Sequence, residues 1–438
     1  MKTRDEFLCL TDFDFKTKFP RSFIRQELSL GKESMSYQKN STPRRRSSNN
    51  RAPHKRNYRN KSSNINPSRF INKAVKVAEQ EVYQSKHKFA DFNLNNQTLS
   101  TLSHLGFDNP TPIQDQCIEL ALDGKDVIGL ANTGTGKTAA FVLPIIEKTA
   151  ANRRAVSTLI LAPTRELAQQ IDADLRKFSA GQKIYSTLVV GGMNINNQIR
   201  QIKRGPHVII GTPGRVKDLI NRRVLRLSQV TTFVLDEADR MCDMGFVGDI
   251  REIEVELSKQ RQTLCFSATM TPNVQSIVEE FMIDPVTVAI SQNVTSEHIE
   301  QSIIEASDKE QKINLLHELL EKESYDKVII FGETKYGVQR LADRLTKNDM
   351  NAVAIHGNKS QSQRDKALRI FKSGEAKIMV ATDVAARGLD IPNVSHVINF
   401  DAPKQYDDYV HRIGRTGRAG NSGRAFTFVD KPKFTSKR

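Results

Sequence analysis

Apolar residues recur along the first half of this chain in short runs, separated by longer segments with helical periodicity. In the segments 165–179 and 271–281, apolar residues lie three and four positions apart, as on one face of a helix. Strands that alternate with helices in this way predict a parallel sheet covered by helices on both faces. The apolar runs that we expect to be strands are 127–130, 158–161, 187–190, 207–210, 233–235 and 264–266.

A second alternating series follows a polar stretch at 291–299, which we interpret as a linker. A chain of 438 residues exceeds what one hydrophobic core ordinarily supports, so two domains are expected. We therefore predict an α/β fold with two tandem domains, the first over 89–290 and the second over 300–438. The strands expected in the second domain are 328–331, 352–355, 378–381, 397–400 and 425–429.

The N-terminal part of the chain follows neither pattern. We expect residues 1–68 to be a disordered tail, because the segment 41–68 is rich in Arg, Lys, Asn, Ser and Pro and has almost nothing to bury. From Phe70 to Lys88 the apolar residues return at roughly helical spacing. This spacing predicts a short amphipathic helix over 69–88 that can dock on the body of the protein.

The charge of the chain is concentrated in this N-terminal part. The net charge is +16, and residues 1–88 hold 21 Lys and Arg against 8 Asp and Glu, which leaves only +3 for the remaining residues. Such asymmetry is typical of a segment that binds a polyanion. The alternative is a solvated, self-repelling tail with no binding role.

Cysteine usage and hydropathy indicate the cellular compartment in which the protein works. Cys9, Cys117, Cys242 and Cys265 have neither metal-ligand spacing nor a plausible disulfide pattern, as expected in a reducing cytosol. No run approaches the roughly 18–20 apolar residues of a membrane span. The first six residues include two acids and no apolar run, so a secretory signal is not expected. We expect a cytoplasmic protein without a membrane partner.

A small-residue loop follows the first predicted strand and precedes a predicted helix. Its glycines let backbone N–H groups face a polyphosphate, Lys137 can reach the β- and γ-phosphates, and Thr138 can hold Mg²⁺. The loop departs from the general pattern G-x-x-x-x-G-K-[ST] at its first position, and a purely structural turn is the alternative for such a motif alone. Its residues are Ala131, Asn132, Thr133, Gly134, Thr135, Gly136, Lys137 and Thr138.

Two acids stand directly after the predicted strand 233–235. Asp236 is placed to complete a Mg²⁺ shell, and Glu237 to orient and deprotonate an attacking water. Paired acids after a strand are also a common helix start, and that interpretation would be preferred for this motif alone. Because the loop and the acids occur together, the sequence predicts an ATPase.

With this loop and these acids, the chain resembles the DEAD-box RNA helicases of helicase superfamily 2, of the bacterial RhlE-like type. The resemblance covers about residues 89–429, its motifs come in the family order, and Ala131 at the first loop position is usual there. It implies two RecA-like domains with parallel sheets, of the P-loop NTPase type. The motifs that carry it include Pro110-Thr111-Pro112-Ile113-Gln114, Asp236-Glu237-Ala238-Asp239, Ser267-Ala268-Thr269, Ala381-Thr382-Asp383 and His411-Arg412-Ile413-Gly414-Arg415-Thr416-Gly417-Arg418.

The resemblance assigns roles around ATP. Phe89 would stack on adenine, Gln114 would read its edge, and Asp390 would also contact the nucleotide. Lys137, Thr138 and Asp236 would hold the phosphates and Mg²⁺, and Glu237 would be the catalytic base. Residues that would couple hydrolysis to domain movement are Asp239, Ser267, Thr269 and His411.

The resemblance also assigns residues to the second domain and to RNA. Three arginines among glycines at 411–418 suit phosphate binding better than a core, and Arg415 and Arg418 are the candidate arginine fingers. Residues that would contact the RNA are Thr164, Arg165, Gly192, Thr212, Arg215, Gln361, Arg364 and Thr382.

The predicted function is that of an ATP-dependent RNA helicase with ATP and Mg²⁺ as cofactors. We expect it to separate RNA duplexes locally or to remodel RNA–protein complexes, such as ribosomal precursors or mRNA, as a monomer with little sequence preference. An ATP-gated RNA clamp would carry the same motifs, and a duplex-unwinding assay separates the two. A DNA translocase is disfavoured by Gln114 and the Asp-Glu-Ala-Asp motif, and replacing RNA by DNA in an ATPase assay tests it.

Overall fold

The computed structural model describes residues 66–71, 83, 85–132, 134–152, 155–290, 299–386, 391, 393–417 and 422–431. Most of the predicted tail, most of the predicted helix over 69–88 and most of the predicted linker lie outside these residues. At the start of that predicted helix, Phe70 is the last residue of a 3₁₀ helix, η1 (Pro67–Phe70).

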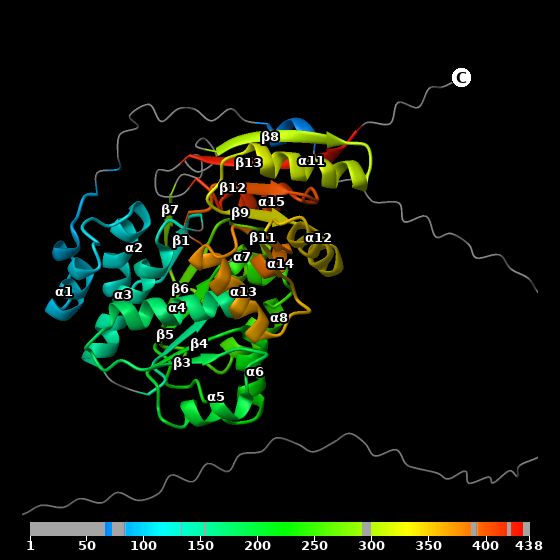
Figure 1. Cartoon of the computed structure of the whole chain (residues 1–438). Coiled ribbons are helices and arrows are strands. Elements are labelled where there is room, and N and C mark those ends of the chain that lie inside the picture. Colours follow the sequence, from blue (N-terminus) through cyan, green and yellow to red (C-terminus); the bar gives the residue numbers. More distant parts are fainter. Residues whose placement is uncertain are drawn as a thin grey trace, which may run out of the picture. The chain divides into compact units, whose positions relative to one another are not determined.

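The first sheet has seven strands, and all of its neighbouring strands are parallel (Figure 1). Their order across the sheet is β3-β4-β2-β5-β6-β1-β7. This order brings β1, which precedes the glycine-rich loop, next to β6, with β5 and its acids one strand further on. The strands are β1 (Val127–Leu130), β2 (Thr158–Leu161), β3 (Ser186–Val189), β4 (Val208–Gly211), β5 (Thr232–Asp236), β6 (Gln262–Ser267) and β7 (Val286–Ala289).

Successive residues of these strands face opposite sides of the sheet and belong to different cores. On β5, Val234 packs with α2, α3 and α4, whereas Phe233 and Leu235 pack with α6, α7, α8 and α9. Helices therefore cover both faces, as the alternating pattern predicts. The helices of this part are η2 (Phe89–Asp91), α1 (Asn96–His104), α2 (Pro112–Leu122), α3 (Lys137–Ala151), α4 (Arg165–Phe178), α5 (Ile195–Ile202), α6 (Pro213–Asn221), α7 (Ala238–Asp243), α8 (Val247–Glu254) and α9 (Pro272–Phe281).

The second sheet has six parallel strands in the order β10-β11-β9-β12-β13-β8. Residues of β9 again alternate between two cores, Ile330 facing α11 and α12, and Ile329 facing α13 and α14. The elements are β8 (Ile299–Ala306), α11 (Lys309–Lys322), β9 (Val328–Phe331), α12 (Lys335–Lys347), β10 (Ala352–Ile355), α13 (Gln361–Ser373), β11 (Ile378–Ala381), α14 (Asp383–Ala386), β12 (His396–Asn399), α15 (Tyr406–Ile413) and β13 (Gly423–Asp430).

The predicted fold class, two parallel-sheet α/β domains, is confirmed. Two strands were not predicted, β7 and β8, and Ile299 begins β8 although the sequence assigns it to the linker. Both strands lie at the edge of their sheets. In the described part of the chain, every helix is too short or too polar to cross a bilayer.

Candidate active site

The loop 131–136 joins β1 to α3 and turns on two glycines. Gly134 and Gly136 have φ of 88° and 92°, in the left-handed region that side chains disfavour. A Cβ on Gly136 would also collide with the side chain of Gln114, so this position needs glycine for space. The loop presents the N-terminus of the 15-residue helix α3, which is the usual arrangement of an anion-binding loop.

Lys137 is the first residue of α3 and is buried. Its Nζ donates to the Ala131 carbonyl at 2.8 Å across the loop. The Thr135 hydroxyl donates to the Asn132 carbonyl, also at 2.8 Å, and stabilises the same turn. Thr138 follows in the first turn of the helix and is partly exposed. The loop thus combines a cation, a hydroxyl and the helix N-terminus.

The predicted adenine-reading residue is attached to this loop. Gln114 lies in the first turn of α2, where its Oε1 accepts from the Thr111 N–H at 2.9 Å and its Nε2 donates to the Gly136 carbonyl at 3.1 Å. Phe89 is buried against Phe92, and only 4% of it is exposed. Stacking of Phe89 on adenine therefore stays a prediction, and it requires one face of the Phe89 ring to become exposed.

Asp115, which the sequence analysis missed, fixes the chain that leads to Phe89. Its carboxylate accepts from the Tyr83 hydroxyl at 2.5 Å, from the N–H groups of Lys86 and His87 at 2.8 and 3.2 Å, and binds Nδ1 of His87 at 2.8 Å. Burial acts to raise the pKa of Asp115, but these hydrogen bonds together lower it. The only sequence signal for Asp115 was its place next to Gln114, because its hydrogen-bond partners come from outside the helix α2.

Two buried carboxylates lie at the end of β5. Asp236 is the last residue of the strand, and Glu237 has φ of 52° and ψ of 54°. Burial raises the pKa of Asp236 to about 7, although Lys137 opposes this. Burial acts in the same direction on Glu237, but Arg240, Arg415 and Lys137 outweigh it, so the pKa of Glu237 lies below its ordinary value. Glu237 is therefore ionised at neutral pH and able to accept a proton.

Asp239, in α7, connects this acidic strand end to the end of β6. Its Oδ2 accepts from the N–H groups of Ala268 and Thr269 at 3.1 and 3.0 Å and from the Thr269 hydroxyl at 3.1 Å. The Ser267 hydroxyl accepts from the Asp239 N–H at 3.2 Å and donates to the Thr269 carbonyl at 2.8 Å. Three of the four predicted coupling residues therefore form one hydrogen-bonded group.

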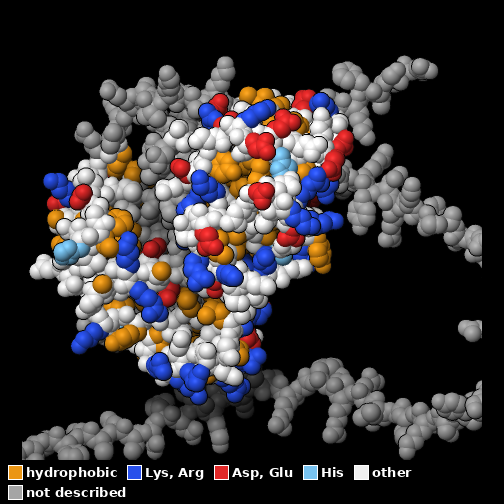
Figure 2. Space-filling view, viewed as in Figure 1, with side chains coloured by type: hydrophobic (Ala, Val, Ile, Leu, Met, Phe, Trp, Pro, Cys, Tyr) orange, Lys and Arg blue, Asp and Glu red, His pale blue; other side chains and the backbone are white. Residues whose placement is uncertain are grey.

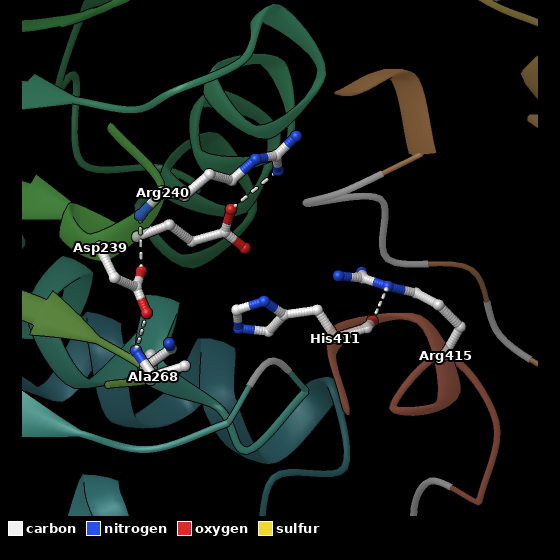
Figure 3. Close-up of a pocket in the computed structure, with 7 residues that line it drawn as sticks. Asp239, Arg240, Ala268, His411 and Arg415 are labelled. Atoms are coloured by element: carbon white, nitrogen blue, oxygen red, sulfur yellow. Dashed lines mark hydrogen bonds and ion pairs between the residues drawn. The ribbon is translucent and has the colours of Figure 1, made fainter. Parts of the chain in front are cut away.

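Side chains from the two sheet domains line one pocket, and Figure 3 shows His411 and Arg415 facing the elements that carry Asp239 and Arg240. Arg240 Nη1 donates to the Glu237 carboxylate at 3.0 Å and Nη2 to the Val384 carbonyl of the second domain at 3.1 Å. Arg240 was not predicted from the sequence, where its only signal is its place directly after the acidic motif. The lining residues are Lys137, Glu237, Asp239, Arg240, Ala268, His411 and Arg415.

The arginines of 411–418 do not share one role. Arg415 lines the pocket, but Arg412 is buried inside the second domain. Arg412 Nε and Nη2 bind the two oxygens of Asp383 at 2.6 and 2.7 Å, and Nη1 donates to Asn399 Oδ1 at 3.1 Å. The expectation that arginines here avoid a core was therefore wrong for Arg412, because Asp383 and Asn399 satisfy its charge and its donors. Arg418 lies outside the described residues, as do Thr133 and Asp390.

Several predicted RNA contacts meet at a second place between the domains. Arg165 Nη1 lies 3.5 Å from Gln361 Oε1, and Arg364 Nη2 lies 2.9 Å from the Glu166 carboxylate. Arg165 also lies so close to Gly192 that a Cβ there would collide with its guanidinium. Burial and the charge of Arg364 lower the pKa of Arg165. Cationic side chains from both domains are thus held close together, which suits a polyanion that spans them.

The remaining predicted RNA contacts lie at or near the starts of helices that follow strands. Thr164 and Thr212 are the N-cap residues of α4 and α6, Thr382 follows β11, and Arg215 Nη1 donates to the Met193 carbonyl at 3.3 Å. Figure 2 shows further Lys and Arg side chains gathered over α5 and α6. Exposed basic residues on and after these helices are Arg200, Lys203, Arg204, Arg222 and Arg223.

Two family descriptions match this chain, "DEAD/DEAH box helicase" over residues 111–277 and "Helicase conserved C-terminal domain" over residues 311–420. The chain is 48% identical over 342 residues to the DEAD-box ATP-dependent RNA helicase CshA of Geobacillus kaustophilus, a match that covers 78% of this chain and 73% of the relative. It is 46% identical to the CshA of Bacillus subtilis, with 78% and 69% covered. These relatives are bacterial, as expected, but are named CshA and so do not support the RhlE-like subtype.

Two solved structures share the fold. One is S. cerevisiae Dbp5 bound to RNA and ADP BeF3, with a TM-score of 0.71, 32% identity and coverage of 78% of this chain and 89% of that one. The other is the DEAD-box helicase Mss116 bound to ssRNA and UDP-BeF, with a TM-score of 0.71, 33% identity and coverage of 77% and 73%.

Proposed function

Because this chain belongs to the DEAD-box family of ATP-dependent RNA helicases, we propose that it hydrolyses ATP in the pocket between Lys137, Glu237 and Arg415. The observation that carries the proposal is the convergence of an ionised carboxylate and an arginine from different domains on one pocket. Glu237 would accept the proton of the attacking water. Arg415 would stabilise the charge of the transferring phosphoryl group, and Lys137 would bind its oxygens.

Mg²⁺ fits the side chains at this site. Asp236 is a buried carboxylate whose pKa is raised to about 7, which means that the surrounding positive charge does not offset its burial. Asp236 and Thr138 would hold a divalent cation that supplies this charge, since both residues offer the oxygen ligands that Mg²⁺ prefers. When bound, Mg²⁺ would neutralise charge on the phosphate oxygens. In this proposal the hydroxyl of Thr138 and the carboxylate of Asp236 orient the ion.

We propose further that domain closure links the nucleotide pocket to RNA. Asp239 ties the acidic strand end to Ser267 and Thr269, and Arg240 bonds Val384 of the second domain. An RNA strand on Arg165, Gln361 and Arg364 would favour the same closed arrangement, so each ligand would raise the affinity for the other. Phosphate contacts of this kind carry little sequence information.

A duplex-unwinding assay tests this function. We expect the full chain, with ATP and Mg²⁺, to release a labelled strand from a short RNA duplex and to hydrolyse ATP faster with RNA than with DNA of the same sequence. Hydrolysis that RNA stimulates without any strand release would favour the ATP-gated clamp. Equal stimulation by RNA and DNA would contradict the proposal. The substrates in the cell would be structured RNAs of the cytoplasm, such as ribosomal precursors or mRNA complexes, acted on by a monomer.

A further inference from the structure

Phe70, far from the family motifs in the sequence, is fully buried against the second sheet domain. It ends η1, and 0% of its surface is exposed. Its ring centroid lies 4.7 Å from that of Tyr409, with the planes inclined by 52°. It shares a small apolar cluster with residues of β8, α15 and β13, namely Ile299, Tyr409, Ile413 and Ala425.

The helix α15 has two faces that serve different purposes. Tyr409 and Ile413 are four residues apart and lie on one face, which packs on Phe70 and the sheet. His411 lies two positions from Tyr409 and so projects from the opposite face, and Arg415 follows just past the helix end. His411 and Arg415 line the nucleotide pocket. The apolar face of α15 therefore helps to set where these two side chains lie.

The position of α15 depends in part on this packing, because Arg412 also ties the helix to Asp383 and Asn399. The helix has only eight residues, and helices of that length are marginal by themselves. Its described N-cap residue, Gln405, makes no side-chain hydrogen bond to the helix. The Tyr409 hydroxyl donates to Gln301 Oε1 at 2.8 Å, which holds one point of the buried face. Phe70, from outside the second domain, packs its ring on one side of Tyr409, and Tyr406 of α15 also lies against Tyr409.

We propose that Phe70 is a positioning residue for hydrolysis: by packing on Tyr409 it holds α15 so that Arg415 reaches the pocket that contains Glu237. The inference rests on the proposed role of Arg415. Truncation of Phe70 would leave the larger cores of the second sheet intact, since these are formed by other residues. It would allow α15 to shift, and small displacements of catalytic groups have large effects on rate.

The test measures RNA-stimulated ATPase of the full chain with Phe70→Ala, Phe70→Leu and a matched control, Ile71→Ala, whose side chain is the exposed neighbour. We expect Phe70→Ala to lower kcat roughly fivefold or more, with KM for ATP within about twofold of the original. Phe70→Leu should restore most of kcat, and Ile71→Ala should match the unaltered chain. A kcat for Phe70→Ala within about twofold of the unaltered chain would overturn the proposal.

A double-mutant cycle separates positioning from loss of fold. If Phe70 acts through Arg415, Phe70→Ala should cause no further loss of single-turnover hydrolysis in an Arg415→Ala background. If Phe70→Ala lowered the single-turnover rate by the same factor in both backgrounds, the inference would be overturned. If Arg415→Ala alone retained full turnover, the proposed function itself would fail. If Arg415→Ala abolished turnover while Phe70→Ala did not affect it, only the role of Phe70 would fail. Thermal unfolding followed by circular dichroism verifies that each variant is folded at the assay temperature.

Discussion

Glu237 combines backbone strain with a dense set of charges. Its φ of 52° lies in the left-handed region, which costs a non-glycine residue about 1–2 kcal/mol. The Asp236 carboxylate accepts from its N–H at 3.0 Å and helps to hold this conformation. Strained residues of this kind cluster at sites of chemistry, and here the strain aims a carboxylate at Arg240 and at the pocket.

Replacing Glu237 by Gln should therefore separate hydrolysis from binding. The amide keeps the shape of the side chain but cannot accept a proton, so we expect turnover to fall on the order of 10²-fold or more. RNA affinity in the presence of ATP should persist or rise, because the closed arrangement lasts longer. Steady-state ATPase and fluorescence anisotropy of labelled RNA measure both. Lys137→Ala is the contrasting variant, since it should weaken ATP binding itself. Near-normal turnover of Glu237→Gln would contradict the assignment of Glu237 as the base.

Arg412 and Arg415 should respond in opposite ways to substitution. Arg412→Ala removes one partner of a buried pair, a change that typically costs 3–5 kcal/mol, and we expect about 3 kcal/mol because the Asp383 side chain is 26% exposed. Arg415→Lys should leave the unfolding free energy nearly unchanged but should not support hydrolysis, since an ammonium does not reproduce the planar fork of donors. Denaturant unfolding and ATPase assays of both variants check this. Equal stability of Arg412→Ala and the unaltered chain would contradict the structural role.

At the scale of elements, prediction succeeded where a strand is buried on both faces. The strands β1, β2, β9 and β11 lie inside their sheets and appear in the sequence as continuous apolar runs, which is the signal expected of parallel sheets. The edge strands β3 and β10 keep that signal, because half of their residues are buried, whereas the edge strands β7 and β8 lack it. More than half of the residues of β7 and β8 are partly or fully exposed, so polar residues interrupt the run.

The candidate site could be predicted as far as its motifs are contiguous. The loop residues, Asp236, Glu237 and Arg415 follow from local patterns and the family resemblance. The roles of Asp115 and Arg240 depend on partners distant in sequence, Tyr83 for the former and Val384 for the latter. A single sequence carries no record of such pairings, so only the fold could reveal them.

The helix α15 belongs to the second domain, which gives a prediction about the first domain alone. A fragment of residues 89–295 keeps the complete first sheet and both of its cores but lacks His411 and Arg415. We expect it to bind ATP weakly and to show almost no RNA-stimulated hydrolysis, because the stabilising arginine is missing. Equilibrium binding of a fluorescent ATP analogue and ATPase with and without RNA provide the measurement. A fully active fragment would show that the first domain hydrolyses ATP unaided.

At the scale of the whole molecule, charge and motifs are separated along the chain. The motifs lie between Phe89 and Arg418, in a part whose net charge is close to balanced, whereas residues 1–88 carry 21 basic and 8 acidic residues. A binding surface assembled by two domains is expected to respond to ATP. A run of basic residues without a nucleotide site is not, and counterion release would govern its attraction to RNA.

Deleting residues 1–65, which leaves η1 and Phe70 in place, should therefore change RNA affinity without changing maximal turnover. Each basic residue engaged on a single strand contributes about −0.7 to the slope of log K against log salt, so the loss of roughly five contacts should flatten the slope by about 3.5. The RNA concentration for half-maximal ATPase should rise, most strongly at low salt, while kcat at saturating RNA stays the same. The measurement is RNA-stimulated ATPase at several salt concentrations for the full chain and the deletion. Replacing the Arg and Lys of this segment by Gln, at unchanged length, is the control that assigns the effect to charge. An unchanged slope and an unchanged half-stimulation would mean that the basic segment has no part in RNA binding.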